Sequence, residues 1–475
     1  MTTLSTERYP QEAKKALSDP ILKKALKGLQ DRLGNGALAA YRNLPEGEDL
    51  RHLAHNIRMS HVRNLDVLID TLGRNIRNQG GHVFFASDAA AATDYVMNLA
   101  RKRGVCSVVK GKSMTSEEIG INTALENEGI TVTETDLGEF IIQLAGEHPS
   151  HIIAPAIHKT REDIGRLFET TIGIPYTDDP PTLTLAARKY LRTRFLNADM
   201  GITGCNLACA QTGQIALVSN EGNIRLSTTL PRIHVAIMGM ERICATLDEQ
   251  MLLLRLLCRG ASAQKMGGYV SFIAGPRKDG FQDGPEEFHL IVLDNGRSRI
   301  LADPVFREVL CCIRCGGCLN VCPVYARIGG HTYGYAYSGP IGAVVTPLLT
   351  GIERSKHLYC GETLCGACKD VCPVGIDLPR MLLALRHIHA EGSQRWNVRT
   401  KHLLESLAYG FWAHLMTHPH LYNAAIRLGH ELSPLIQRLP IPGWTPHRAV
   451  PSLAKRRFTQ SPMSQTSTGE GRHGH

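Results

Sequence analysis

The chain lacks the long apolar run that a membrane-spanning helix needs. About 18 consecutive apolar residues are required to cross a bilayer, but the densest apolar stretch, residues 251–257, carries Arg255 at its centre. The N-terminal sequence MTTLSTERYPQEAKK is polar and charged, unlike the apolar core of a secretory signal. We therefore expect a cytoplasmic chain with no transmembrane segment.

Concentrated charge and nucleotide-binding glycines are also missing. The net charge of +9 is small for 475 residues, and the basic residues are dispersed rather than gathered into a stripe with aromatics. This distribution argues against a nucleic-acid partner. No G-x-G-x-x-G stands between a strand pattern and a helix pattern, so a dinucleotide-binding Rossmann site is not expected.

Cysteine, in contrast, is abundant in one short stretch. Nine of the fourteen cysteines fall within residues 311–372. A first run, C-x2-C-x2-C-x3-C-P, begins at Cys312, and a second run, C-x2-C-x3-C-P, begins at Cys365. This spacing is typical of two ferredoxin-type [4Fe–4S] clusters and predicts a chain that transfers electrons.

The geometry of such runs assigns the ligands. Three cysteines on a tight loop place three sulfurs on one face of a cuboidal cluster, and the cysteine before proline ligates the other cluster. The first cluster is therefore assigned Cys312, Cys315, Cys318 and Cys372, and the second is assigned Cys322, Cys365 and Cys368.

The fourth ligand of the second cluster is left open by the sequence. Glu362 stands where the spacing would place a cysteine, and Cys360 lies two residues earlier. Three alternatives follow: Cys360 is a displaced eighth ligand, the iron takes a non-cysteine ligand, or the cluster lacks that iron. Cys311, which neighbours a ligand, is expected to point away.

Structural zinc is the alternative interpretation of these cysteines. Zinc prefers four ligands from two paired C-x2-C or histidine knuckles, and two runs ending in Cys-Pro fit that pattern poorly. A disulfide framework is less expected still, because nothing secretory precedes the cysteines.

Strand and helix patterns alternate ahead of the cysteines, which predicts an α/β fold with a mostly parallel sheet. Thr115 with Glu118 suggests a capping box that opens one helix ending at Gly129. The expected strands are 82–86, 106–109, 130–133, 152–154, 214–219, 233–238, 269–274 and 289–293.

Composition and pattern divide the chain into five parts. We expect an N-terminal helical extension at 1–60, an α/β domain at 61–303, a two-cluster ferredoxin-type domain at 304–380, a helical C-terminal region at 381–450 and a disordered tail at 451–475.

Several motifs resemble the LUD domain of lactate-utilisation proteins. They are Val109–Met114, Glu134–Glu139, Pro149–Lys159, Ala198–Gly204, Thr212-Gly213, Asn220–Asn223 and Asp294–Arg297. Gly443–Pro446 is similar to a motif near the end of the iron–sulfur member. With a LUD domain followed by a two-cluster module, the chain resembles the lactate utilisation protein B family.

The resemblance implies a fold like that of the sugar-phosphate isomerase and coenzyme A transferase group, followed by an α-helical cluster domain. It also implies oxidation of L-lactate to pyruvate with two partners, a second LUD protein and a cysteine-rich subunit. On this interpretation the chain is an oxidoreductase subunit rather than a complete enzyme, held near the inner face of the membrane through its partners.

The reaction needs one more cofactor. A 2-hydroxy acid releases two electrons, whereas a cluster accepts one at a time, so a flavin or nicotinamide must lie between them. We expect a flavin on this chain or on a partner, and no catalytic residue is assigned. Candidate ligand-binding or acid–base residues are Lys110, Lys112, Asp136, Glu139, His151, His158, Asn220, Gly222, Asn223 and Arg297. The alternatives are solvated lysines, structural histidines and, for Glu139, the opening of a helix through 140–144.

Two other groups are noted. Cys205 and Cys209 form C-x3-C and are interpreted as buried apolar residues rather than a metal pair, and His331, Tyr333, Tyr335 and Tyr337 follow the first run as packing or cluster-edge residues. Two alternative functions stay open: the equivalent subunit of another 2-hydroxy-acid oxidoreductase, of the glycolate type, and a non-redox small-ligand-binding protein with a structural metal.

Overall fold

The computed structural model describes residues 5–399, 403–436, 445 and 448. The chain forms two units, Met1–Arg399 and Thr400–His475, which are described separately. The tail predicted at 451–475 and most of the motif Gly443–Pro446 lie outside the described residues.

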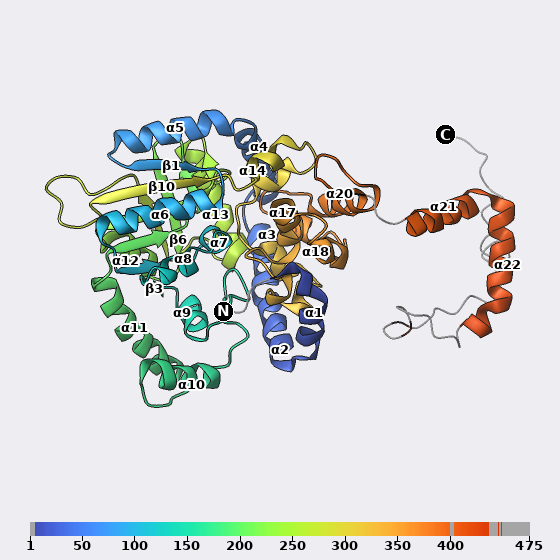
Figure 1. Ribbon diagram of the computed structural model, residues 1–475, viewed down its shortest axis with the longest axis horizontal. Helices are drawn as coiled ribbons and strands as arrows, with labels where there is room; N and C mark the ends of the chain where they lie inside the picture. Colours follow the sequence, from blue (N-terminus) through green and yellow to red (C-terminus); the bar gives the residue numbers. More distant parts are fainter. Residues whose placement is uncertain (1–4, 400–402, 437–444, 446–447, 449–475) are drawn as a thin grey trace. The chain divides into compact units, whose positions relative to one another are not determined.

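A six-stranded parallel sheet forms the centre of the first unit, with strand order β1-β10-β7-β4-β2-β3 (Figure 1). All its pairings are parallel, which confirms the predicted α/β fold. Strand β7 is buried along its whole length because both faces of the sheet are covered. The strands are β1 His82–Ala86, β2 Ser107–Lys110, β3 Thr131–Glu134, β4 Met200–Thr203, β7 Ile233–Gly239 and β10 Glu287–Leu293.

Helices and a second sheet cover the two faces. On one face, α6 (Ala89–Arg103) and α8 (Ile121–Asn127) pack on the strands, and on the other face α5 (Leu65–Asn78) packs. In Figure 1, β1 and β10 lie between α5 and α6. The second sheet, of order β8-β5-β6-β9, lies on the α5 side and contains β5 Leu207–Cys209, β6 Gln214–Ser219, β8 Ile243–Cys244 and β9 Tyr269–Ile273.

The remaining helices of this region connect the strands. They are α7 Met114–Glu118, α9 Leu137–Leu144, α10 Arg161–Ile172, α11 Pro180–Leu196, α12 Asn223–Thr229, α13 Leu247–Ser262 and α14 Arg297–Ala302. Helices α9, α10 and α11 share a separate apolar cluster with Val109 of β2.

Short helices carry the cysteine-rich region, residues 304–380. They are η3 Arg307–Cys311, α15 Gly317–Val321, α16 Tyr325–Ile328, η4 His331–Tyr333, α17 Gly339–Thr350, α18 Lys356–Gly361 and α19 Ala367–Asp370, and α20 Leu378–Glu391 packs onto them. They share one apolar core with α13 of the α/β region.

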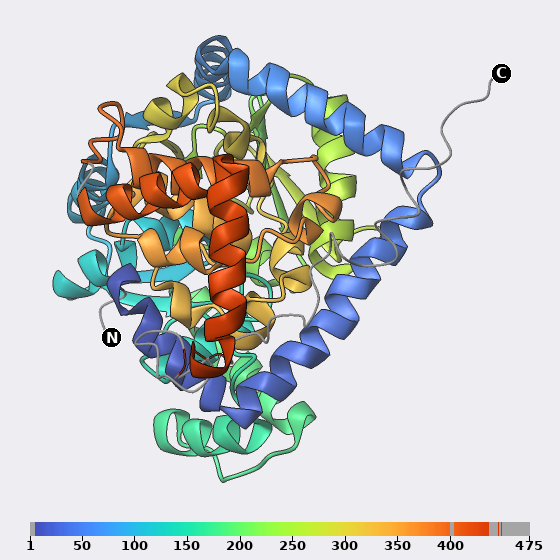
Figure 2. The same cartoon turned by 90° about the vertical axis from the view of Figure 1, so that its right-hand side faces the viewer.

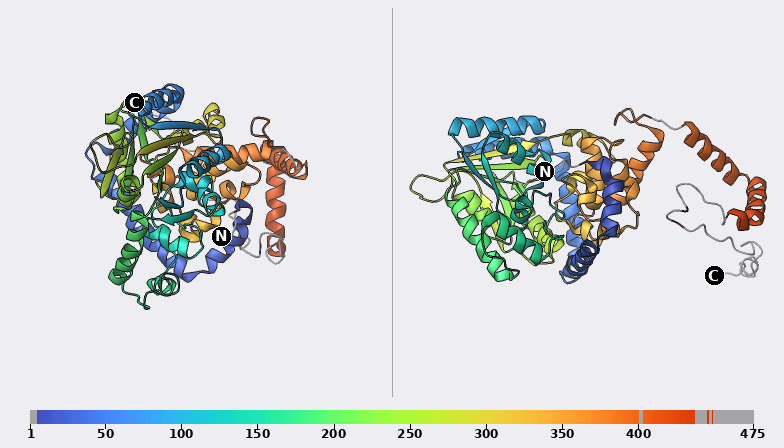
Figure 3. Two further views of the ribbon diagram at one scale, coloured as in Figure 1. Left: turned by 60° about the vertical axis from the view of Figure 1, so that its left-hand side comes forward. Right: turned by 60° about the horizontal axis from the view of Figure 1, so that its bottom comes forward.

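The N-terminal helices pack mainly on the cysteine-rich region rather than on the parallel sheet. Tyr9 meets Tyr333 edge to face, with ring centroids 5.9 Å apart. Figures 1 and 3 show these blue helices beside the orange cysteine-rich region, and Figure 2 shows them from that side. They are η1 Thr6–Arg8, α1 Tyr9–Ser18, α2 Pro20–Leu29, a π-helical turn Gln30–Gly34, α3 Asn35–Arg42 and α4 Gly47–Arg63.

Three local predictions were wrong. Residues 152–154 form a bend and irregular backbone instead of a strand, because the backbone N–H groups of Ile153 and Ala154 donate to His151 Nδ1. The predicted single helix is two helices, because Gly120 adopts a positive φ between α7 and α8. Ser113, rather than Thr115, caps α7 through its hydroxyl.

The described part of the second unit consists of two helices in contact, α21 Leu403–Thr417 and α22 Pro419–Ile436. Several large apolar side chains on them, including Phe411 and Trp412, are exposed. Across the described residues of both units, every helix is too short or too polar to span a bilayer.

Candidate metal centre and adjoining cavity

The first cluster loop, residues 312–322, turns tightly and carries three of the predicted ligands of the first cluster. It follows η3, and Arg314 and Gly316 adopt positive φ values of 60° and 74° that turn the chain tightly before α15. Cys372 arrives from the second loop. Burial, and then the neighbouring Cys372 and Cys312 thiols, raise the pKa of Cys315. The same three thiols act on Cys318, so the four predicted ligands of the first cluster lie together.

The remaining predicted ligands gather at a second point. Burial, and then the charges of Glu362 and Cys365, raise the pKa of Cys368 to about 12. Cys322 Sγ lies 3.4 Å from Glu362 Oε2. The structure therefore brings Cys322, Cys365 and Cys368 toward one site, and it places Glu362 among them.

These sites suit iron–sulfur clusters chemically. Backbone N–H groups of Arg314, Gly317, Tyr325 and Ile376 donate to the sulfurs of Cys312, Cys315, Cys322 and Cys372 at 3.4–3.5 Å. Hydrogen bonds of this kind tune the reduction potential of a cluster. Burial raises the pKa of the Cys315 and Cys372 thiols, so they ionise readily only beside a cationic centre, and iron supplies that charge.

Zinc fits the same cysteines less well. A zinc ion about 2.3 Å from each sulfur would draw its ligands to within about 4 Å of one another. In the described part of the chain, the group of three metal-binding atoms that approach within 4.8 Å is instead His82, Glu287 and His289. That group is already engaged, because Tyr95 contacts His289 and Arg103 pairs with Glu287.

Buried arginines tie the first cluster loop to the surrounding helices and strands. Arg58 of α4 donates to the carbonyls of Ile243 at 2.7 Å and of Cys311 at 3.2 Å. Arg242 donates from Nη1 to the Cys312 carbonyl at 2.8 Å. These cations, both nearly fully buried, place positive charge beside the cluster site.

One helix of the α/β region approaches the cluster closely at a glycine. A Cβ placed on Gly260 of α13 would lie 3.1 Å from Cys315 Sγ and 2.6 Å from the Tyr41 hydroxyl. Glycine therefore permits the contact between α13 and the first cluster loop.

A cavity of about 450 Å³ lies between the α/β region and the first cluster loop. Its wall includes Cys315, a predicted cluster ligand, and Arg314 beside it. The α/β region also contributes lining residues to this cavity, including Lys112, Asp136, Cys205, Asn220, Glu221, Asn223, Arg242 and Cys258. The volume is that of a typical small-molecule site.

Two cationic side chains on the cavity wall, Lys112 and Arg314, each have a nitrogen that could donate a hydrogen bond to a ligand. Lys112 Nζ and Arg314 Nη1 are buried atoms without a hydrogen-bond partner among the described residues. Lys112 lies 3.6 Å from Glu139 Oε1, a loose ion pair. Because an unsatisfied buried donor is unfavourable, both atoms are suited to an anionic ligand in the cavity.

Two other predicted cations are already paired within the protein. Lys110 lies 2.8 Å from Glu134 and is buried, and Arg297 pairs with Glu118 at 2.7 Å and Glu241 at 2.8 Å. Burial alone would raise the pKa of Glu241, but Arg297 and then Arg314 hold it at about 2. Lys110 and Arg297 thus neutralise the protein's own carboxylates.

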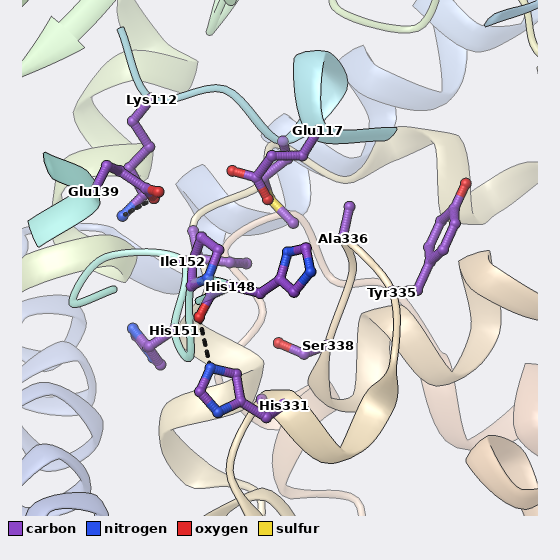
Figure 4. Close-up of a pocket in the computed structure, with 13 residues that line it drawn as sticks. Lys112, Glu117, Glu139, His148, His151, Ile152, His331, Tyr335, Ala336 and Ser338 are labelled. Carbon is purple, nitrogen blue, oxygen red and sulfur yellow. Dashed lines mark hydrogen bonds and ion pairs between the residues drawn. The ribbon is translucent and has the colours of Figure 1, made fainter. Parts of the chain in front are cut away.

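A smaller pocket of about 30 Å³ adjoins this network (Figure 4). Lys112 reaches toward Glu139 on one side, while His331 Nε2 contacts the His148 carbonyl at 2.6 Å on the other (Figure 4). Burial raises the pKa of Glu117 in this pocket to about 7, although Lys110 opposes the shift. Glu117 was not singled out from the sequence, where it resembles an ordinary polar position of a helix.

The other predicted residues have mainly structural contacts. His151 Nε2 lies 3.0 Å from Asn320 Oδ1 on α15, and burial lowers its pKa to about 3. His158 pairs with Glu147 at 2.7 Å. Asp136 caps α9 by accepting from the Glu139 N–H, so it, rather than Glu139, begins that helix.

The cysteines outside the cluster set occupy different surroundings. Cys311 Sγ contacts Met59 Sδ at 3.3 Å. Burial raises the pKa of Cys205 to about 12, and Cys209 is buried in β5. Cys360, at the end of α18, is exposed.

The aromatic residues after the first run are packed between the two regions. Tyr333 donates to Glu362 Oε1 at 2.9 Å, and the Tyr337 ring lies under Arg314 at 4.3 Å. Gly222 is the N-cap residue of α12 and has no side chain to cap it, whereas Asn220 Oδ1 accepts from the Gly268 N–H.

Three known protein families match successive parts of the chain. Residues 69–293 match the LUD domain family, 308–376 match the 4Fe-4S dicluster domain family and 388–465 match the C-terminal family of lactate utilisation protein B. The chain therefore carries a 4Fe–4S dicluster domain after a LUD domain.

Whole-length relatives share this organisation. The chain is 44% identical over 464 residues to lactate utilization protein B of Shouchella clausii and 42% identical over 468 residues to that of Bacillus licheniformis, covering 96% of each chain. It is 43% identical to an uncharacterized electron transport protein, YkgF, of Escherichia coli, over 90% of this chain and 88% of the relative. The chain belongs to the lactate utilisation protein B family.

Proposed function

We propose that this chain is the iron–sulfur electron-transfer subunit of a multi-subunit system that oxidises L-lactate to pyruvate. The observation that carries the proposal is the cavity of about 450 Å³ whose wall joins the LUD domain to Cys315. A ligand in this cavity would lie directly beside a predicted ligand of the first cluster. Membership of the lactate utilisation protein B family supports lactate as the substrate of the system.

The wall of the cavity favours an anion. Lys112 Nζ and Arg314 Nη1 have no hydrogen-bond partner among the described residues, and charge-assisted bonds from such buried donors are strong. Carboxylate and phosphate groups both provide the required oxygen acceptors. The occupant is therefore the carboxylate of a 2-hydroxy acid or the phosphate of a flavin, the cofactor that converts a two-electron step into single electrons.

The two cluster sites provide the proposed route for the electrons. Clusters held there would accept and release one electron at a time. Cys372 lies in the second loop and is assigned to the first cluster, while Cys322 lies in the first loop and is assigned to the second. This exchange of ligands ties the two loops together and keeps the two sites adjacent, as a relay requires.

The division of the chain at residues 60, 303, 380 and 450 is part of this proposal. Residues 61–303 supply most of the cavity, 304–380 supply the cluster ligands and 1–60 brace the cluster loops. The proposed partners are a second LUD protein and a cysteine-rich subunit, and the exposed apolar side chains of α21 and α22 are surface suited to them.

Anaerobic co-purification tests the proposal. The full chain, isolated with its partners, should contain about eight irons with matching acid-labile sulfide and should reduce an artificial acceptor when given L-lactate. Activity with glycolate in place of L-lactate would move the proposal to another 2-hydroxy-acid oxidoreductase. About two zincs and no sulfide would overturn the electron-transfer role.

Growth provides an independent test. Deletion of the gene should abolish growth on L-lactate and spare growth on pyruvate, because pyruvate enters after the proposed step. Normal growth of the deletion strain on L-lactate, in a background without a second lactate oxidase, would contradict the assignment of substrate.

A further inference from the structure

We infer that the Glu362 carboxylate is the fourth ligand of the second cluster, which is therefore held by three cysteines and one glutamate. The inference concerns the cluster sites of the proposed function and deepens them. Two candidates compete for this position, Glu362 and Cys360, and the structure separates them.

The backbone of the two cluster loops repeats. Each position of the second loop follows its counterpart by 50 residues, which pairs Cys315 with Cys365 and Cys318 with Cys368. In this register Glu362 corresponds to Cys312.

The dihedral angles follow the same register. Arg314 and Leu364 are both non-glycine residues with positive φ, 60° and 57°, a conformation that is uncommon outside glycine. Gly316 and Gly366 have φ of 74° and 90°, and each directly precedes a short helix, α15 or α19.

The first ligand positions also match. Cys312 directly follows the last residue of η3, with φ −59° and ψ 125°. Glu362 directly follows the last residue of α18, with φ −77° and ψ 146°. Glu362 therefore occupies in the second loop the place that Cys312 occupies in the first, and its side chain leaves the loop at the equivalent point.

The contacts of Glu362 lie on the cluster side. Its Oε2 is 3.4 Å from Cys322 Sγ, the sulfur that the first loop contributes to the second cluster. Its Oε1 accepts from the Tyr333 hydroxyl at 2.9 Å. One carboxylate oxygen is thus directed to the ligand set, while the other is held in place by a tyrosine.

The burial of Glu362 calls for a cationic partner. The residue is 7% exposed. Arg386 donates to its backbone carbonyl at 2.6 Å, but in the described part of the chain no lysine, arginine or histidine forms an ion pair with its carboxylate. An unpaired buried carboxylate is strongly unfavourable. Iron provides the missing charge: an Fe–O bond forms at the carboxylate oxygen, and the carboxyl proton leaves to solvent.

Cys360 has the opposite surroundings. It is exposed, as the predicted ligand Cys365 also is, but it lies in the last turn of α18, two residues before the register position of the ligand. The charges that act on its thiol come from Arg386 and Lys356, and its carbonyl accepts from Arg386. Arg386 also donates to the Glu362 carbonyl at 2.6 Å, so the side chains decide: the Glu362 carboxylate reaches Cys322 and Tyr333, whereas the Cys360 thiol faces Arg386 and Lys356.

Iron content and electron paramagnetic resonance of the full chain, purified anaerobically, test the inference. The wild type should hold about eight irons per chain. Glu362→Ala should lose about one of them and show the signal of an oxidised three-iron cluster, because the corner iron loses its protein ligand. Glu362→Cys should restore the full iron content, with a shifted reduction potential of the second cluster because thiolate replaces carboxylate.

Cys360→Ala is the matched control and should retain about eight irons with an unchanged spectrum. If Glu362→Ala does not fold, Glu362→Gln keeps the size of the side chain and the contact with Tyr333 while removing the charge. Loss of iron from Cys360→Ala, a full iron content with an unchanged spectrum in Glu362→Ala, or a three-iron signal already in the wild type would each overturn the inference. Iron counting needs no lactate, so these outcomes are independent of the substrate assay.

Discussion

Arg242, which lies in the LUD domain, donates a hydrogen bond from Nη1 to the backbone carbonyl of Cys312, 2.8 Å away. Its other nitrogen, Nη2, donates to the carbonyl of Ile313 at 3.1 Å. Arg242 is 4% exposed, so little water screens its charge. One side chain therefore positions the start of the first cluster loop and places a cation beside it.

Replacement of Arg242 should change the potential of the first cluster. In Arg242→Gln, adding an electron to the cluster is less favourable because a nearby positive charge is gone, so the reduction potential should fall by on the order of tens of millivolts. Arg242→Lys keeps the charge and should shift it less. A redox titration followed by electron paramagnetic resonance measures both, and Arg101→Gln, on the exposed pair with Glu128, is the control. Equal potentials in the wild type and Arg242→Gln would contradict this role.

Loss of a first-cluster ligand should stop the relay. Cys318→Ala removes one of four predicted sulfur ligands, so we expect the first cluster to lose iron, below the wild-type content of about eight, and lactate oxidation by the assembled complex to be abolished. Cys106→Ala, at an exposed cysteine far along the sequence from both loops, should leave iron content and rate unchanged. Full activity of the Cys318→Ala complex would show that electrons bypass this cluster.

The features that could be predicted from the sequence are those that depend on local patterns. Ligand spacing is a property of one tight loop, so Cys312 and Cys315 could be assigned from their spacing alone, and strand periodicity located β1 and β7. Family resemblance, rather than pattern, pointed to the LUD fold. The strand predicted at 152–154 failed because a side chain, His151, satisfies the backbone there, which β-propensity does not report.

Contacts between distant segments could not be predicted. The approach of Glu362 to Cys322 depends on how two loops pack, and the approach of α13 to Cys315 depends on a single glycine, Gly260. The cavity arises only where the LUD domain and the first cluster loop meet. Lys110 and Lys112 are equivalent in the sequence, yet Lys110 is paired with Glu134 while Lys112 Nζ has no hydrogen-bond partner among the described residues.

The half-buried Glu117 should make stability depend on pH. Its pKa is raised from 4.5 to about 7 by burial, so the folded chain binds more protons than the unfolded chain between these values. The stability from this group is therefore present below pH 4.5 and is lost as pH rises toward 7. Relative to the wild type, Glu117→Gln should gain melting temperature as the pH is raised from 5 to 8. Glu169→Gln, on the exposed surface of α10, is the control, and a pH-independent difference for Glu117→Gln would contradict the shift.

The anion-binding role of Lys112 can be separated from cluster assembly. Lys112→Met keeps the apolar stem of the side chain and removes the Nζ donor that lines the cavity beside Cys315. A buried charge-assisted hydrogen bond is worth about 1.5–3 kcal/mol, so the affinity for the anionic ligand should fall by roughly tenfold or more. In the assembled complex this loss should appear in KM if the cavity holds the 2-hydroxy acid, or as flavin lost on purification if it holds the cofactor. Iron content and the spectra of both clusters should be unchanged, since Lys112 contacts neither ligand set.

Lys102→Met, at an exposed position of α6, controls for the loss of one positive charge. A Lys112→Met complex with wild-type KM, flavin content and rate would contradict the anion-binding role of Lys112.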